Sequence, residues 1–295
     1  MLLLCALKCK RGYIVTCSRV LYNIVVMNNE SSMKYAVMSD VHANPTALAR
    51  AVDDAKMNGV DGFICLGDIV GYGSSPNEAI TLSREVFAEK VVLGNHDAAI
   101  VREMSMDSFS RRAQKSILAQ RYMVDESNLD WLAARSHFIR ERNLLFVHGD
   151  ANLDAGSIKA GFGYVFRLED VDRVLSAVSG FGVNIVFVGH THEPMIWRQN
   201  GDGSVELLDE NRIIVSSSDH YAVNVGTVGC PRSVPYASYA IVEVKGNGNV
   251  DVELRKLSFD YFAYRDSLLA ANADVPIWLE DMLSNPQAAE KMLKC

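Results

Sequence analysis

Five short apolar segments of the chain are each followed at once by side chains that can bind a metal ion. Runs of four or five β-branched and aromatic residues are typical of buried strands in an α/β sheet. Open α/β sheets have their ligand crevice at the carboxyl ends of the strands. The pattern therefore predicts one metal site to which several strand ends contribute. The five predicted strands are 35–38, 62–66, 90–93, 144–147 and 185–188.

The polar residues behind these strands form a set that chance explains poorly. A single Asp-x-His pair occurs in many chains, and one His at a strand end is usually a structural residue. Here such residues follow all five predicted strands in turn, which favours a shared site over core packing. They are Asp40, His42, Asp68, Asn95, His96, Asp97, His148, His190 and His192.

Helices are predicted between the strands. Asn44 followed by Pro45 is typical of a helix start, and Gly59 is expected to end that helix. A second helix is expected from Pro76 to about Glu89. This strand-helix-strand order builds a mostly parallel sheet. We interpret the polar and basic residues 98–143 as two or three surface helices inserted beside the site, where they could form one wall of the cleft.

The second half of the chain has a different pattern. Residues 150–166 are expected to form a loop over the site, and residues 168–178 a helix. After His192, short strands follow one another without helices, and the period-two alternation at 250–254 is typical of a half-exposed antiparallel strand. Further strands are expected at 213–215, 221–223 and 239–242, and docking helices within 259–283.

These elements predict an α/β fold in which two sheets pack face to face with helices outside. We expect one domain over residues 33–295, including the helical insertion and the C-terminal helices. Residues 1–32 make a poor signal peptide, because no basic segment precedes their short apolar run and basic residues follow it. We interpret them as a mis-assigned or disordered extension, with a membrane-touching arm as the alternative.

The composition of the chain disfavours two classes of binding partner, nucleic acids and membranes. The formal net charge of −7 disfavours nucleic acid, which requires Lys and Arg to displace counterions from phosphates. Arg111, Arg112 and Lys115 are expected on a solvated helix face. No segment approaches the roughly 18 apolar residues of a membrane span, so no membrane partner is expected. Cys65 lies in a predicted strand as a reduced core thiol, which favours a reducing, cytoplasmic compartment.

Three motifs resemble those of a known family. Ser39-Asp-Val-His-Ala-Asn44, Gly67-Asp-Ile-Val-Gly-Tyr-Gly73 and Asn224-Val-Gly-Thr-Val-Gly-Cys-Pro-Arg232 resemble the calcineurin-like metallophosphoesterase superfamily, in its small bacterial and archaeal phosphodiesterase branch. The resemblance runs from about Met33 to Leu257 and implies a four-layer fold of two packed mixed sheets flanked by helices. It also implies two divalent metal ions, the first held by Asp40, His42, Asp68 and His192, and the second by Asp68, Asn95, His148 and His190.

The resemblance further implies how the site works. Asp68 would bridge the metals, a hydroxide shared by both would attack phosphorus, and His96 would protonate the leaving oxygen or stabilise the transition-state charge. Asn44, Tyr72 and Arg232 are assigned to substrate binding. The ligand set of imidazoles, carboxylates and one amide suits Mn, Fe, Zn, Co or Ni, and Mn is expected to support activity in vitro.

The chain also departs from its relatives. Protein Ser/Thr phosphatases of this superfamily carry Asp-Arg-Gly where this chain has Gly71-Tyr72-Gly73, so the carboxylate that orients His96 and the Arg that grips phosphate are missing. A protein phosphatase of that type is therefore disfavoured, and Asp97 is a candidate partner for His96. Asp150 occupies a position where relatives often have Ser. It either adds negative charge near the second metal or caps the next turn.

We therefore expect a metal-dependent phosphoesterase that hydrolyses a small phosphodiester, phosphomonoester or nucleotide. One alternative is a binding scaffold that has kept the fold and lost catalysis, although such losses usually delete ligands and all seven are present here. Another alternative is a nuclease, against which the negative charge speaks. The substrate, the native metal and the oligomeric state stay open.

Overall fold

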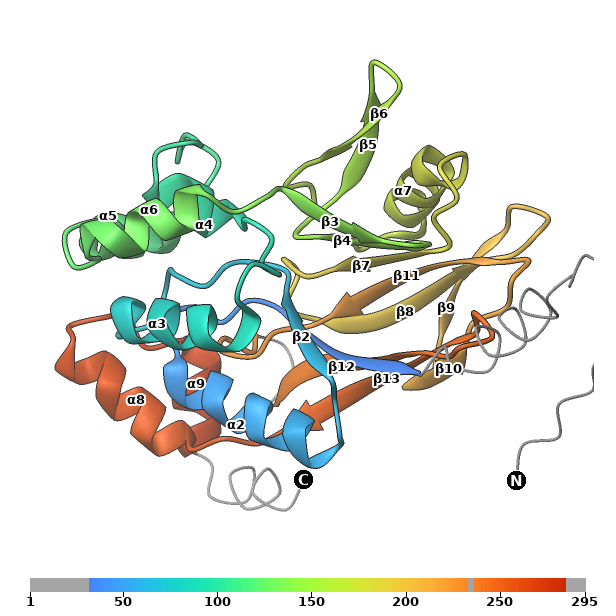
Figure 1. The fold of residues 1–295 in the computed structure, drawn as a ribbon. Coiled ribbons are helices and arrows are strands. Elements are labelled where there is room, and N and C mark those ends of the chain that lie inside the picture. Colours follow the sequence, from blue (N-terminus) through green and yellow to red (C-terminus); the bar gives the residue numbers. More distant parts are fainter. Residues whose placement is uncertain (1–31, 233–235, 285–295) are drawn as a thin grey trace, which may run out of the picture.

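Two β-sheets form the centre of the structure (Figure 1). The computed structural model describes residues 32–232 and 236–284. The first sheet consists of β1 (Met33–Met38), β2 (Gly62–Cys65), β10 (Arg212–Ile214), β12 (Ala237–Val244) and β13 (Val250–Leu257). The second sheet consists of β3 (Phe138–Glu141), β4 (Leu144–Val147), β7 (Ile185–Val188), β8 (Pro194–Gln199), β9 (Val205–Leu208) and β11 (His220–Val225).

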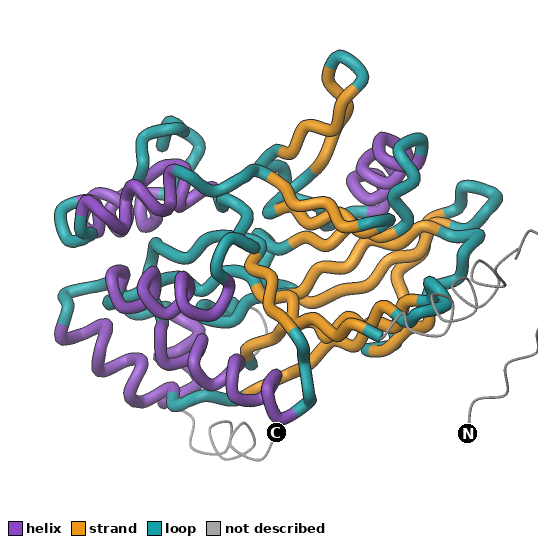
Figure 2. The backbone as a smooth tube through the Cα atoms, in the orientation of Figure 1, coloured by secondary structure: helices purple, strands orange, loops and turns teal. Residues whose placement is uncertain are grey.

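Both sheets are mixed, and each combines strands from the two halves of the chain. The strand order is β10-β13-β12-β1-β2 in the first sheet and β3-β4-β7-β11-β8-β9 in the second. β1 pairs in parallel with β2, and β7 pairs in parallel with β4 and β11. The other pairings are antiparallel, as in the hairpin of β12 and β13. Among the parallel strands, β2 is an edge strand of the first sheet, whereas β4, β7 and β11 lie inside the second. Figure 2 shows the strands at the centre of the structure with helices outside them.

Helices cover the outer faces of both sheets and complete four layers. Along β1, Val37 packs in the core between the sheets, whereas Ala36 and Met38 pack in the core beneath the helices. Beyond the second sheet, Val174 and Leu175 pack in a third core. The predicted α/β fold of two packed sheets flanked by helices is confirmed. The helices are α2 (Pro45–Met57), α3 (Pro76–Phe87), α8 (Tyr261–Ala270) and α9 (Ile277–Ser284) on the first sheet, and α7 (Leu168–Ser179) on the second (Figure 1).

Local signals place the first helix as predicted. The side chain of Asn44 accepts a hydrogen bond from the backbone N–H of Ala47, and Pro45 stands at the first helical position. The helix ends at Met57, and Gly59 takes a φ of 68°, which a residue without a Cβ adopts most easily.

One predicted strand and one predicted loop are corrected by the structure. Residues 90–93 do not form a strand of the sheet, because Val91 and Val92 make only isolated bridges to Cys65 and Ser136. Residues 150–166 contain a hairpin of β5 (Ala151–Asp154) and β6 (Ser157–Ala160). Its two-residue turn, Ala155-Gly156, has positive φ at both positions, as tight hairpin turns require.

The insertion at 98–143 contains the predicted helices and an additional strand. The helices are α5 (Arg111–Arg121) and α6 (Glu126–Ala133), preceded by the short α4 (Asn95–Ile100). Its last residues form β3, which pairs with β4 at the edge of the second sheet. β3 is therefore a correction to the purely helical prediction.

The predicted N-terminal extension lies outside the described residues, apart from Ser32, as do four of the six cysteines. Cys65 and Cys230 are free and buried. Burial raises the pKa of the Cys65 thiol, so this side chain is the protonated core thiol that the sequence predicts. None of the helices described here has the length and apolar character needed to cross a bilayer.

Asp54 connects α2 to the first sheet, and its loss is expected to destabilise the fold. Its carboxylate accepts hydrogen bonds from Tyr239 Oη at 2.7 Å and from Arg255 Nη2 at 3.2 Å, and the residue is 7% exposed. Asp54→Ala leaves the Tyr239 hydroxyl without this partner, so the free energy of unfolding should fall by about 1–3 kcal/mol in denaturant titrations. The exposed neighbour gives the control, Asp53→Ala, with a change within about 0.5 kcal/mol. Equal losses in both variants would contradict this role.

Candidate metal centre

All seven predicted metal ligands come together where strands of both sheets end. The ligands are buried, and none is more than 8% exposed. They follow β1, β2, β4 and β7, except for one that begins α4, so the predicted convergence of strand ends is present. They are Asp40 and His42 after β1, Asp68 after β2, Asn95 at the start of α4, His148 after β4, and His190 and His192 after β7.

The backbone at these positions is strained and held in place by neighbouring loops. Five of the seven residues have left-handed φ values between 47° and 67°, a conformation that costs a non-glycine residue about 1–3 kcal/mol. The loops after β1 and β2 support it by pairing with each other: Asp40 N donates to Gly67 O at 3.0 Å, and His42 N donates to Asp68 O at 2.9 Å. Such outliers persist where the surrounding structure fixes them, and they cluster at functional sites.

The first group of facing acceptor atoms comes from the side chains of Asp40, His42 and His192. Each imidazole donates its Nδ1–H to a backbone carbonyl, His42 to Val70 O at 3.0 Å and His192 to Cys230 O at 2.5 Å. In the neutral form both Nε2 atoms therefore carry lone pairs, yet they lie 3.1 Å apart. Asp40 Oδ1 lies 3.1 Å from His192 Nε2 and 3.5 Å from His42 Nε2.

The second group gathers around His148. Its Nδ1–H donates to Leu66 O at 2.9 Å, so in the neutral form of the ring its Nε2 also points a lone pair into the site. This Nε2 lies 2.9 Å from Asn95 Oδ1, 3.2 Å from His190 Nδ1 and 3.4 Å from Asp68 Oδ2. Nitrogen and oxygen acceptors again converge on one point.

Asp68 stands between the two groups. Its Oδ2 lies 3.4 Å from His148 Nε2 and 3.7 Å from His42 Nε2, while its Oδ1 accepts a hydrogen bond from His96 N at 2.8 Å. Asp40 Oδ1 is buried without a hydrogen-bond partner. Facing lone pairs and a carboxylate oxygen without a donor require a cation between them. Histidines whose other nitrogen is fixed by a carbonyl are the usual ligands of such a cation, so the residues fit divalent metal ions.

The charges of the site suit cation binding. Burial raises the pKa of Asp68, but His148 and His96 outweigh burial and keep the pKa well below its ordinary value. Burial also raises the pKa of Asp40, but the neighbouring histidines, His192 first, outweigh it and keep that pKa well below its ordinary value. Burial lowers the pKa of His148, but Asp68 outweighs burial and raises this pKa to about 9. In the absence of a metal ion, a proton on His148 thus offsets the negative charge of Asp68.

His96 lies against the first group but has an incomplete set of partners. Its ring contacts those of Tyr72 at 4.8 Å, His42 at 4.9 Å and Phe109 at 5.2 Å between centroids. Its Nδ1 is buried without a hydrogen-bond partner. Burial lowers its pKa to about 3, so the imidazole is neutral at physiological pH.

Asp97 does not orient His96, which corrects the proposed pairing. One carboxylate oxygen of Asp97 accepts hydrogen bonds from Ile69 N at 2.9 Å and Val70 N at 3.1 Å, and the other accepts from Gly94 N at 3.2 Å. One oxygen therefore holds the loop after β2, and the other holds the residue that precedes α4. The carboxylate shapes the backbone beside the site instead of polarising the imidazole.

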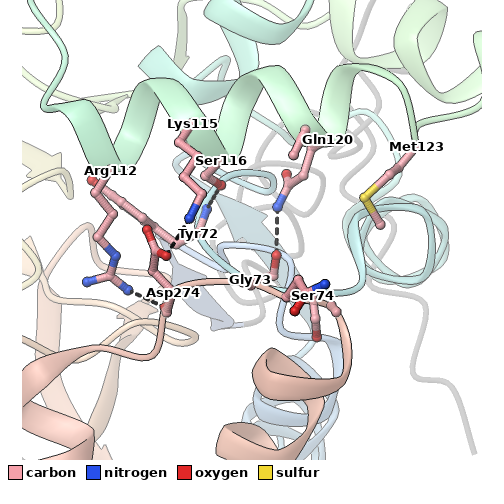
Figure 3. A pocket seen from close by; sticks show the side chains of 13 residues that line it. Tyr72, Gly73, Ser74, Arg112, Lys115, Ser116, Gln120, Met123 and Asp274 are labelled. Carbon is pink, nitrogen blue, oxygen red and sulfur yellow. Dashed lines mark hydrogen bonds and ion pairs between the residues drawn. The ribbon is translucent and has the colours of Figure 1, made fainter.

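Helix α5 forms one wall of the site and holds the Gly71-Tyr72-Gly73 loop. Gln120 Oε1 accepts from Gly71 N at 2.7 Å. Gln120 Nε2 donates to Gly73 O at 2.8 Å, as Figure 3 shows. Ser116 Oγ accepts from Tyr72 N at 2.5 Å. These two residues were not predicted, because their partners lie more than forty positions away in the sequence and leave no local pattern.

Tyr72 brings two arginines to the edge of the site. Its ring lies 4.8 Å from that of His42, and the guanidinium groups of Arg112 and Arg232 lie 5.3 Å and 5.8 Å from its centroid. Arg112 was expected on a solvated helix face. The structure packs it against Tyr72 instead, and its Nη2 donates to Asp274 O at 3.0 Å (Figure 3).

Asn44 and Asp150, which the sequence analysis also singled out, make contacts that hold neighbouring segments of the fold together. Asn44 uses both ends of its amide, because Oδ1 accepts from Ala47 N and Nδ2 donates to Gly229 O at 3.0 Å. It joins the start of α2 to the Asn224–Arg232 loop, and its role in substrate binding stays a prediction. Asp150 forms an ion pair with Arg173 at 3.0 Å, so it anchors the chain after β4.

Known proteins of similar sequence and structure support a common family. The family model of the calcineurin-like phosphoesterase superfamily domain matches residues 33–247. The uncharacterized protein MJ0912 from Methanocaldococcus jannaschii is 32% identical over 253 residues, covering 84% of this chain and 96% of that protein. A metallophosphoesterase from Sphaerobacter thermophilus is 28% identical with a TM-score of 0.67, covering 84% of this chain and 96% of the other. The hypothetical protein PH1004 from Pyrococcus horikoshii OT3 shares the fold, with a TM-score of 0.61 and 14% identity. The match covers 85% of this chain and 97% of that protein.

Metal binding is expected to weaken as the pH falls. Because His148 is protonated below about pH 9 in the metal-free protein, a metal ion must displace that proton. The apparent Kd for Mn²⁺ should therefore rise about tenfold per pH unit from roughly pH 8 to pH 6. Isothermal titration calorimetry in buffers of different ionisation enthalpy measures both the Kd and the released proton. A Kd that stays constant over this range would rule out the displacement.

Proposed function

This chain belongs to the calcineurin-like phosphoesterase superfamily, and we propose that it hydrolyses a small phosphate ester at two divalent metal ions. Membership of this family makes it a hydrolase that acts on phosphoric esters. The observation that carries the two-metal proposal is the convergence of acceptor atoms on two points, one on each side of the Asp68 carboxylate. A structural role alone would not require buried lone pairs to face one another.

Each metal has its own set of ligands under this proposal. Asp40, His42 and His192 would hold the first ion with Asp68, and Asp68 would share the second ion with Asn95, His148 and His190. When bound, two such ions supply a hydroxide nucleophile near neutral pH and neutralise the charge of the phosphoryl group. The absence of thiolates among the ligands suits Mn²⁺ and other borderline ions, and Mn²⁺ is the first choice for assays.

His96 is placed to assist the departure of the leaving group. Its backbone N–H holds Asp68, and its ring lies against that of the ligand His42. A neutral imidazole can donate a hydrogen bond to a phosphate oxygen, and the negative charge of a bound phosphate raises its pKa again. Arg112 and Arg232 at Tyr72 provide positive charge for oxygens that the metals leave uncovered.

The two alternatives predicted from the sequence are less well supported. A scaffold that has lost catalysis would no longer need to keep all seven ligands buried and facing one another. A nuclease would need a cationic surface to bind the phosphate backbone, whereas the chain has a formal net charge of −7. The scaffold also predicts a different result in the experiment below.

Substitution of a metal ligand and of His96 should remove activity in different ways. Against an aryl phosphomonoester and an aryl phosphodiester with Mn²⁺, Asp68→Ala should lose turnover because it loses bound metal. His96→Ala should lower kcat by about 10²-fold or more while elemental analysis still finds the metal. The exposed His137, which pairs with Glu103, gives the control His137→Ala, with normal kcat. Unchanged kcat in His96→Ala would exclude the role of His96, and a wild-type protein inert with several metals would favour the scaffold.

The position of His96 can be tested without changing the histidine. A Cβ on Gly71 would lie 2.1 Å from His96 Nδ1, so Gly71→Ala should displace the imidazole and lower kcat as His96→Ala does. Gly203 has a similar φ of 86°, but a Cβ there would meet nothing within 4 Å, which makes Gly203→Ala the control for backbone strain. Both variants should lose about 1 kcal/mol of stability or more. Similar kcat values for the two variants would contradict the steric argument.

A further inference from the structure

An open hollow lies beside the metal centre on the side of His190. It measures ≈ 460 Å³, which is within the size range of small-molecule sites. Thr191, which lies between the ligands His190 and His192, forms part of its lining, so the hollow lies next to the ligand cluster. The lining residues are Tyr164, Phe166, Arg167, Asp170 and Thr191.

Two aromatic side chains of the hollow are exposed next to the ligands. The ring of Tyr164 stacks on that of His190, with centroids 4.1 Å apart and planes at 20°. Tyr164 is nevertheless 55% exposed, and Phe166 is 47% exposed. One face of the Tyr164 ring thus covers a ligand, and much of the remaining ring surface is free to stack on another planar group.

The segment that carries these aromatics is held in place before any substrate binds. Asp150 accepts a hydrogen bond from Gly163 N at 3.0 Å and pairs with Arg173 of α7 at 3.0 Å. Gly161 N donates to Asp150 O at 2.8 Å. A Cβ on Gly163 would lie 2.5 Å from Asp150 Oδ2, so a larger residue would not fit there. A fixed surface loses little conformational entropy when it binds a ligand.

The hollow also contains a cation without an acidic partner. The guanidinium of Arg167 makes no ion pair among the described residues, and the residue is exposed. The nearby carboxylate of Asp170 accepts from the backbone N–H of Arg167 at 3.1 Å and lies 3.8 Å from Arg173. Arg167 is therefore available for a polar or anionic group at the far side of a substrate.

We propose that Tyr164 and Phe166 form a stacking platform for a planar aromatic group of the substrate. This inference rests on the proposed function and narrows its substrate class to phosphate esters that carry a nucleobase or another aryl ring. Stacking on aromatic side chains tolerates many ring types, since every base and aryl group has a π face. An alkyl phosphate would reach the metals but would leave the platform unused.

The experiment compares a nucleoside, an aryl and an alkyl phosphate ester of the same type, with Mn²⁺ bound. Tyr164→Ala and Phe166→Ala should each lower the ratio of kcat/KM for the aromatic esters to that for the alkyl ester by about tenfold, through KM. Referring each ratio to the wild-type ratio removes the differences in leaving-group reactivity. Tyr164→Phe should keep the ratio, and Phe262→Ala, which removes an aromatic 46% exposed on α8, serves as the matched control.

Two further readouts separate the platform from its surroundings. Elemental analysis checks that Tyr164→Ala keeps its metal, because Tyr164 contacts His190. The Kd values of phenylphosphonate and methylphosphonate test stacking without turnover, and their ratio should shift about tenfold in both platform variants.

The outcomes distinguish this inference from the proposed function. Unchanged ratios in both alanine variants would overturn the platform, and an equal loss for aromatic and alkyl esters would do the same. A lowered ratio for the nucleoside ester alone would identify the aromatic group as a nucleobase. A wild-type protein that hydrolyses none of the esters would contradict the proposed function, while the two phosphonates would still test the platform.

Discussion

The structure of this site depends on nitrogen and oxygen atoms that are all acceptors in their unprotonated, metal-binding forms and that the fold nevertheless brings within about 3–4 Å of one another. The Nε2 atoms of His42 and His192 face each other at 3.1 Å, and Nε2 of His148 faces the oxygen of Asn95 at 2.9 Å. A cation removes this conflict, and a fold that selects it must hold the acceptors in place beforehand. Three features hold the acceptors in place. A backbone carbonyl accepts from the Nδ1–H of His42, His148 and His192, five ligands have left-handed backbone, and the loops after β1 and β2 pair with each other.

The sequence allowed the fold class and the ligand set to be predicted because their signals are local. A strand, its ligand and the helix that follows are adjacent in the chain, so Asp40, His42 and Asp68 could be assigned from pattern and motif. The other contacts join distant residues. Gln120 holds the backbone of Gly71 across 49 positions, and no periodicity marks such a pair. Asp97 was assigned to the wrong partner because adjacency to His96 says nothing about where its carboxylate points.

The insertion between Asn95 and β4 changes the chemistry available to this family member. Where related protein phosphatases carry an arginine in the loop after β2, this chain has Tyr72, and α5 supplies Arg112 to the ring of that tyrosine. Positive charge beside the metals is thus recovered from a different element of the fold. On the side of His190, the chain after β4 contributes Tyr164 and Phe166. The two walls have unlike character, one cationic and one aromatic.

The ligands come from both sheets, so metal binding would also link the two sheets mechanically. Asp40, His42 and Asp68 follow strands of the first sheet, whereas His148, His190 and His192 follow strands of the second. Cations bound between these ligands would link the two sheets at one end of their interface. Apolar side chains join the remainder of the interface. Sliding of one sheet over the other would pull the ligand sets apart. Release of the ions would therefore remove one of the links that oppose sliding of the two sheets.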